Sequence, residues 1–177
     1  MTTLDTPLSS NEYAPAFAGY LSRFPEGPVL EALQAQIDLF VSLTRNLGEV
    51  KETYAYAEGK WSVREVLGHL VDTERVMGYR ALAIARGETG SLPGFDEDLY
   101  AANAPWKDIP LLTIAEEFKG LRWSHVIFFR NLTPEAAVRI GTANGNPASP
   151  RALGRILVGH MRHHFAVLDE RYGVRPL

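Results

Sequence analysis

Residues 149–173 read SPRALGRILVGHMRHHFAVLDERYG, and this segment already indicates the class of fold. Ser149 followed by Pro150 is typical of the start of a helix, and Gly173 is typical of its end. Between them, apolar and histidine side chains recur every three or four residues and so share one helix face. This stripe consists of Leu153, Ile156, Leu157, His160, His164, Val167 and Leu168. A long helix with one such face needs other helices to cover it.

Three earlier segments show the same helical spacing of apolar residues. The first covers residues 28–47. The second covers about residues 62–86 and begins with a capping box between Ser62 and Glu65. A similar box at Thr113–Glu116 predicts the start of the third. Together with the last segment they predict an all-α protein whose architecture is a four-helix bundle.

The connections between these helices are unequal in length. Residues 88–110 contain several glycines and prolines and predict a long irregular loop, which is uncommon in a compact domain unless it is functional. We interpret the acidic run at 96–98 (Asp-Glu-Asp) as a solvated loop rather than a carboxylate base. Residues 133–148 are expected to hold a short helical turn, a brief extended piece and a turn. Residues 1–27 are expected to form an irregular N-terminal arm, and residues 28–177 a single domain.

Composition narrows the classes of function. The chain has 177 residues, with 18 Lys and Arg against 21 Asp and Glu, so its net charge of −3 argues against a large basic surface for nucleic acid or an anionic membrane. It has no cysteine, which excludes disulfides, thiolate nucleophiles and zinc fingers. Any bound metal must therefore be held by histidine and carboxylate. With no bilayer-length apolar run and no signal-peptide pattern, we expect a cytoplasmic protein with neither nucleic-acid nor membrane partners.

The five histidines are the candidates for chemistry. His160 and His164 lie one helical turn apart on the apolar face and can share a metal ion, and His69 lies at the edge of the stripe of the second helix. Histidines satisfied in the core by a carbonyl or carboxylate are the alternative. We interpret His125 as such a core or pocket histidine and His163 as a peripheral group near the site.

Three short motifs add a resemblance to a known family. Residues 159–165 (GHMRHHF), residues 61–72 (WSVREVLGHLVD) and residues 92–96 (LPGFD) resemble, in this order, the motifs of the DinB/YfiT-like family of proposed metalloenzymes. The resemblance extends from about residue 28 to the end of the chain. Each motif alone is only moderately specific, and the ordered set is much more so.

This resemblance implies an up-down-down-up bundle with a long loop between helices two and three. It also implies that three histidines hold one divalent metal ion, with zinc or nickel expected, and these ligands correspond to His69, His160 and His164. Related members are thiol-dependent transferases or isomerases. The resemblance therefore implies an S-transferase that uses a low-molecular-weight thiol, acts on small electrophiles and forms a homodimer. The alternatives are a hydrolase using a metal-bound hydroxide and a non-catalytic metal-binding stress protein.

Some supporting roles stay open at this level. Three neutral imidazoles leave a bound ion its charge and an open position, the arrangement of a catalytic site. The second ring nitrogen of each ligand needs an acceptor. The nearby acidic candidates are Asp72, Glu74 and Asp169. Three arginines are candidates for binding an anionic thiol, with ordinary surface charge as the alternative: Arg122, Arg130 and Arg162.

Overall fold

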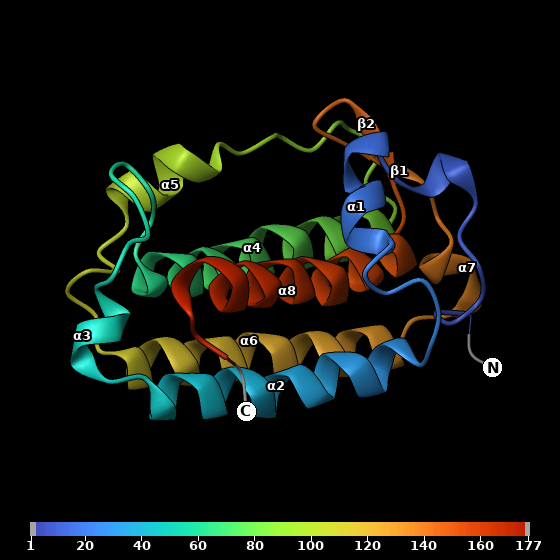
Figure 1. The fold of residues 1–177 in the computed structure, drawn as a ribbon. Coiled ribbons are helices and arrows are strands. Elements are labelled where there is room, and N and C mark those ends of the chain that lie inside the picture. The colour runs from blue at the N-terminus through green and yellow to red at the C-terminus, as the bar shows by residue number, and fades with distance from the viewer. Residues whose placement is uncertain (1–2, 176–177) are drawn as a thin grey trace.

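The computed structural model describes residues 3–175, and four long helices dominate it. They are α2 (Val29–Asn46), α4 (Val63–Ala85), α6 (Leu111–Arg130) and α8 (Pro150–Tyr172). Figure 1 shows that α4 and α6 run in the same direction while α2 and α8 run oppositely to them. This confirms the all-α, up-down-down-up four-helix bundle. Because α4 and α6 are parallel, the chain between them must return along the length of the bundle.

The helix ends show which local signals the structure uses. The Ser62 hydroxyl accepts a hydrogen bond from the Glu65 N–H at the start of α4, as the capping box predicts. At the end of α8, Gly173 adopts the left-handed conformation with φ 63°. The predicted start of α6 at Thr113 is wrong, because the helix begins earlier, at Leu111. Leu111 is buried in the core, so tertiary packing draws the preceding turn into the helix.

The core fills the length of the bundle. One cluster surrounds Ile84, Phe129 and Ile156, and another surrounds Phe40 and Phe118, whose rings stack with centroids 4.0 Å apart. Among residues 3–175, no helix combines the length and the apolar character needed to cross a membrane.

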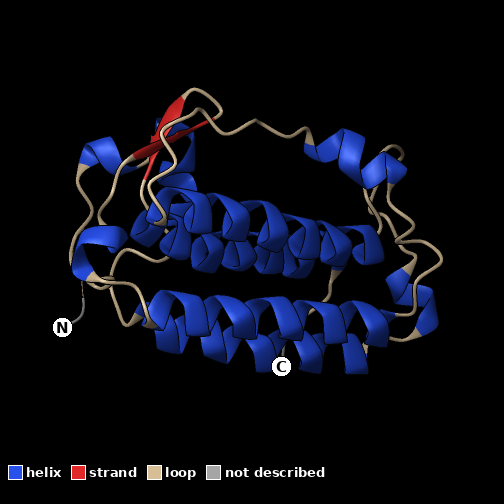
Figure 2. Ribbon diagram, turned by 180° about the vertical axis from the view of Figure 1, so that it is seen from behind, coloured by secondary structure: helices blue, strands red, loops and turns tan. Residues whose placement is uncertain are grey.

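Short elements join the long helices. They are α3 (Glu49–Glu52), α5 (Glu97–Asn103), α7 (Pro134–Ala137), β1 (Gly141–Ala143) and β2 (Asn146–Ala148). The two strands form an antiparallel hairpin above the bundle (Figure 2). Asn144 and Gly145 turn it with positive φ values of 51° and 70°, as a tight hairpin turn requires. Leu92 pairs with this hairpin, since its N–H donates to the Thr142 carbonyl at 2.8 Å, and so the hairpin anchors the crossover between α4 and α6.

The N-terminal arm packs against α8. It carries two 3-10 helices, η1 (Ser10–Glu12) and η2 (Pro15–Phe17), followed by α1 (Ala18–Leu21). The buried Glu12 carboxylate accepts hydrogen bonds from the Ser149 hydroxyl at 2.8 Å and the Arg151 Nε at 2.6 Å. Farther along α8, a Cβ on Gly159 would lie 2.0 Å from the Tyr20 carbonyl oxygen. The absence of a side chain at Gly159 thus lets α1 cross α8 at close range, beside His160.

Candidate metal centre

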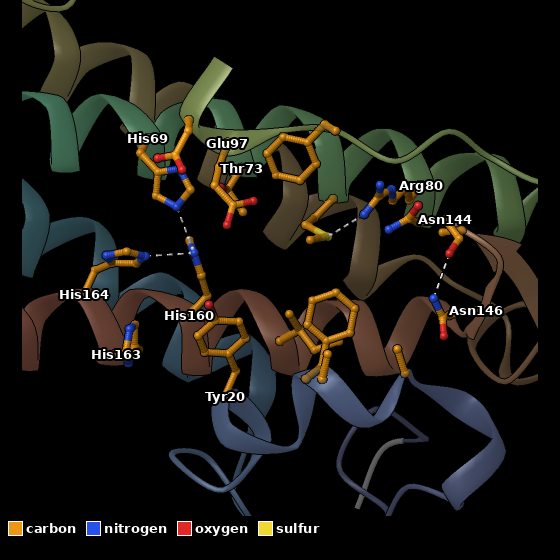
Figure 3. A pocket seen from close by; sticks show the side chains of 18 of the residues that line it. Tyr20, His69, Thr73, Arg80, Glu97, Asn144, Asn146, His160, His163 and His164 are labelled. Atoms are coloured by element: carbon orange, nitrogen blue, oxygen red, sulfur yellow. Dashed lines mark hydrogen bonds between the residues drawn. The ribbon is translucent and has the colours of Figure 1, made fainter. Parts of the chain in front are cut away.

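Three histidines from two packed helices meet at one end of a pocket. His69 lies on α4, and His160 and His164 lie one turn apart on α8. The Nε2 atoms of His69 and His160 are 3.2 Å apart, and those of His164 and His160 are 3.1 Å apart. One ring nitrogen from each residue lies within 4.8 Å of the others. The structure thus brings together all three of the residues predicted as ligands, which we call the histidine cluster (Figure 3).

The chemistry of the cluster fits a bound divalent cation. The Nε2 of a neutral imidazole carries either one proton or one lone pair, so that of His160 can make one well-formed hydrogen bond but faces two rings. A cation accepts a lone pair from every ring. Two nitrogens bound tetrahedrally to one zinc ion at about 2.0–2.1 Å are about 3.3–3.4 Å apart, close to the distances between these rings.

Burial keeps the three rings in the neutral form. It lowers the pKa of His69 to about 4. Burial, together with the neighbouring rings of His69 and His163, lowers the pKa of His164 to about 3. The pKa of His160 is lowered well below its usual value, first by burial and then by His164 and His69. Neutral imidazole is the form that binds a metal ion, so near neutral pH no proton competes for these nitrogens.

Aromatic side chains hold the rings from outside. The Tyr20 ring of α1 contacts His160 edge-on with centroids 5.1 Å apart, and contacts His163 at 5.4 Å. The Trp61 ring lies 4.9 Å from that of His69. His163 lines the pocket but is not part of the histidine cluster. The N-terminal arm therefore supplies one wall of the site.

The crossover between α4 and α6 covers the pocket and corrects one expectation. The acidic run at 96–98 is exposed to solvent, as expected, but it is not a loop: Asp96 caps α5 by accepting from the Leu99 N–H at 3.0 Å, and Glu97 and Asp98 form its first turn. Glu97 and Asp98 line the pocket, as does Phe95 just before them. Figure 3 shows Glu97 on the histidine side of the pocket. Because Glu97 and Asp98 are also exposed, this part of the rim meets solvent.

Residues that sequence reasoning missed lie farther along the same pocket. Thr73, Met77 and Arg80 follow His69 on α4 at intervals of four, four and three residues, and so continue its face. Asn144 and Asn146 of the hairpin line the same end as Arg80 (Figure 3). The helical spacing from His69 could have identified the three α4 residues, whereas nothing local marks the two asparagines. The cavity volume is about 480 Å³.

None of the acidic residues considered as acceptors for the ligands has that role among the described contacts. Asp72 accepts from the Trp106 indole N–H at 3.2 Å, and Asp169 accepts from Arg175 Nε at 2.7 Å. Glu74 is directed to another part of the core. It accepts from the Arg122 Nε at 3.0 Å and pairs with the His125 Nδ1 at 2.8 Å.

The structure also changes the interpretation of one of the three arginines considered as ligand-binding or surface residues. Arg122 is fully buried, so it is neither a surface charge nor open to a cofactor. Its guanidinium donates hydrogen bonds to the Glu74 carboxylate and to the side-chain oxygen of Gln36. The side-chain amide nitrogen of Gln36 in turn donates to the Val158 backbone carbonyl at 2.9 Å. We call Gln36, Glu74, Arg122 and His125 the Arg122 network. His125 is a core histidine, as predicted. The other two arginines, Arg130 and Arg162, are exposed.

Comparisons with known proteins agree with this geometry. The family model described as the DinB superfamily matches residues 32–168. A protein of Oceanobacillus iheyensis named "Putative metal-dependent hydrolase" is 24% identical over 151 residues, which cover 80% of this chain and 86% of that protein. The solved structure of YfiT from Bacillus subtilis, described as a probable metal-dependent hydrolase with an unusual four-helix bundle topology, superposes with a TM-score of 0.73 at 18% identity, covering 97% of this chain and 99% of that one. The protein whose fold and histidine cluster are described above belongs to the DinB superfamily.

Proposed function

We propose that this protein is a metal-dependent hydrolase that acts on a small molecule bound in the pocket beside the histidine cluster. One observation carries the proposal: three neutral ring nitrogens converge at the end of a pocket and form a ligand set that leaves a bound ion an open position. The names of the relatives described above support hydrolysis as the reaction. A divalent ion held there would polarise a carbonyl group and lower the pKa of water.

The residues around the pocket can perform the accompanying proton transfers. Glu97 is the carboxylate that faces the histidine side of the pocket from α5. Tyr20 lines the same pocket, and the pKa of its phenol is raised first by burial and then by the charge of Glu97. In hydrolysis of an ester or amide, Glu97 accepts the proton of the attacking water and returns it to the leaving oxygen or nitrogen. The Tyr20 phenol remains protonated and can donate a hydrogen bond.

The first test is the metal content of untagged protein. We expect about one divalent ion per chain in the native protein and none in the His160→Ala/His164→Ala variant, because two of three ligands are lost. His163→Ala is the matched control, since His163 lies on the same helix and lines the pocket outside the histidine cluster. Native protein that takes up neither zinc nor nickel near neutral pH would refute the proposal.

The second test identifies the reaction. In a panel of esters and amides, Glu97→Gln should reduce kcat by about 10²- to 10⁴-fold while the metal content is unchanged. The same panel is run with a low-molecular-weight thiol and small electrophiles. Metal-dependent consumption of thiol without hydrolysis would favour the S-transferase that the family resemblance implies. Metal binding with neither reaction would favour a non-catalytic metal-binding protein.

A further inference from the structure

The pocket has a second polar end, away from the histidine cluster. Arg80 follows His69 on α4 by 11 residues, which at 1.5 Å per residue is a separation of about 16 Å along the helix. Figure 3 shows Arg80 and Asn144 together on the side of the pocket opposite the histidines. A ligand that fills the pocket therefore meets two distinct polar regions.

Arg80 differs from the other buried arginines in its partners. Arg122 and Arg151 each make an ion pair with a buried carboxylate, Glu74 and Glu12 respectively. The buried Arg155 donates hydrogen bonds to three backbone carbonyls, whereas Arg80 donates to only one. Arg80 is only 5% exposed, yet no carboxylate of the described residues lies within ion-pair distance of it. Buried charges are costly unless they are paired. Burial accordingly lowers the pKa of Arg80.

The neutral contacts of Arg80 leave hydrogen-bonding capacity unused. Its Nη2 donates to the Pro93 carbonyl at 2.7 Å, and its Nη1 lies 3.7 Å from the Met77 sulfur. The guanidinium carbon lies 5.6 Å from the centroid of the Phe95 ring. A guanidinium has five N–H donors in a planar fork that matches a carboxylate, so the known contacts do not saturate it.

Thr73 supplies an independent indication of a ligand. Its hydroxyl is buried, with 2% of the residue exposed, and has no hydrogen-bond partner in the described structure. The side chain lines the pocket one helical turn after His69. A buried hydroxyl without a partner is costly and is normally satisfied by a ligand or water. Thr73 thus offers a hydrogen bond to a polar group near the histidine cluster.

The pocket also has an apolar wall. It is formed by Phe17 of the arm, Met77 of α4, Phe95 of the crossover, Ala143 of the hairpin and Ile156 of α8. Such a wall favours a hydrocarbon segment and disfavours a charged one.

We propose that the pocket selects elongated monocarboxylates, in which Arg80 binds the carboxylate, the apolar wall contacts a hydrocarbon middle, and the bond to be hydrolysed lies near Thr73 and the histidine cluster. This substrate class rests on the proposed function, but the carboxylate subsite itself does not require metal or turnover. One guanidinium neutralises one negative charge, which favours a monoanion. The amides of Asn144 and Asn146 add neutral hydrogen-bonding groups at the same end.

Calorimetric titration of metal-free and zinc-loaded protein with decanoate, and with uncharged decanamide, tests the subsite. We expect decanoate to bind about 10- to 100-fold more tightly than decanamide in both forms, and Arg80→Gln to abolish this preference. Arg75→Gln is the matched control, because Arg75 lies on the same helix but pairs with Glu117 outside the pocket. Equal binding of the two probes by native protein, or an unchanged preference in Arg80→Gln, would overturn the proposal.

Further measurements distinguish the carboxylate subsite from a folding defect of the variant and from the proposed hydrolase function. Arg80→Lys retains the charge without the fork, and we expect it to keep part of the preference, which guards against a folding defect in Arg80→Gln. For esters that carry a remote carboxylate, Arg80→Gln should raise KM about 10- to 100-fold with kcat unchanged, as loss of uniform binding predicts. A preference for decanoate in the metal-free protein, combined with no hydrolytic activity in the zinc-loaded protein, would refute the proposed function and retain the subsite.

Discussion

The histidine cluster and the Arg122 network are two buried polar groups in one bundle, and they differ in how their bonding capacity is used. In the Arg122 network, Glu74 receives hydrogen bonds from Arg122 and pairs with His125, and Gln36 extends the chain to a backbone carbonyl. In the histidine cluster, three nitrogens face one another without a charged protein partner among the described residues. Both groups are therefore buried, and they differ in whether hydrogen-bond donors and acceptors are matched within the protein. They are matched in the Arg122 network, whereas the histidine cluster needs a ligand to complete its bonding.

Breaking the Arg122 network should have the largest effect on stability. Glu74→Gln removes the only carboxylate that pairs with the fully buried Arg122 in the described structure. We expect the free energy of unfolding to fall by about 3–5 kcal/mol, because an uncompensated buried charge remains. Chemical denaturation measures this value.

Glu117→Gln is the matched control for that change. Glu117 pairs with Arg75 at the surface, so its loss should cost at most about 1 kcal/mol. If the free energy of unfolding fell equally in Glu74→Gln and Glu117→Gln, the buried ion pair of the Arg122 network would contribute no more to stability than a surface pair.

In metal-free protein, acid should reduce the stability contributed by the histidine cluster at a higher pH than that contributed by the Arg122 network. The pKa of His69 is about 4 in the folded state against about 6.5 when unfolded, so the unfolded chain takes up the proton first as the pH falls. Stability therefore declines below pH 6.5, by about 2 kcal/mol for this ring between about pH 6.5 and 5.

The Arg122 network should withstand the same pH range. Burial alone would raise the pKa of Glu74, but Arg122 and His125 outweigh it and lower the pKa below 4.5. The stabilising effect of the ionised Glu74 is therefore fully present above the pKa that Glu74 has in the unfolded chain. It is lost only as the pH falls below that value, towards the lower pKa of the folded state. Urea unfolding in chelator should show a shallower pH dependence for His69→Gln than for native protein. Identical profiles would contradict the assignment of the acid sensitivity to the histidine cluster.

A smaller perturbation tests how tightly the Arg122 network is packed. A Cβ on Gly78 would lie 2.1 Å from the His125 Nε2, so Gly78→Ala must displace that ring. We expect a loss of about 1–3 kcal/mol with no change in metal content. At Gly120 of α6, nothing lies within 4 Å of a new Cβ, and Gly120→Ala should instead stabilise the helix by about 0.5–1 kcal/mol. Loss of metal in Gly78→Ala would show that the two groups are coupled.

Sequence reasoning succeeded where a local pattern determines the outcome. The Ser62 and Ser149 caps and the apolar stripes predict the long helices, and the one-turn spacing of His160 and His164 indicates their shared face. It failed for Arg122, whose partner Glu74 is 48 residues away, because a charge pair between helices leaves no local trace. The same limit applies to the pocket beyond His69, since its far end forms only when the hairpin and the crossover pack over α4.

The pairing of Glu12 with Arg151 also has a consequence for the order in which the protein is assembled. These residues are 139 positions apart, and Tyr20 likewise contacts distant residues of α8, namely Gly159, His160 and His163. During synthesis the arm leaves the ribosome before α2, α4 and α6, and α8 follows all of them, so contacts of this separation close late. The nascent chain therefore exposes the arm without its partner until α8 has been made. Pocket and histidine cluster become complete together, only when α8 has been made.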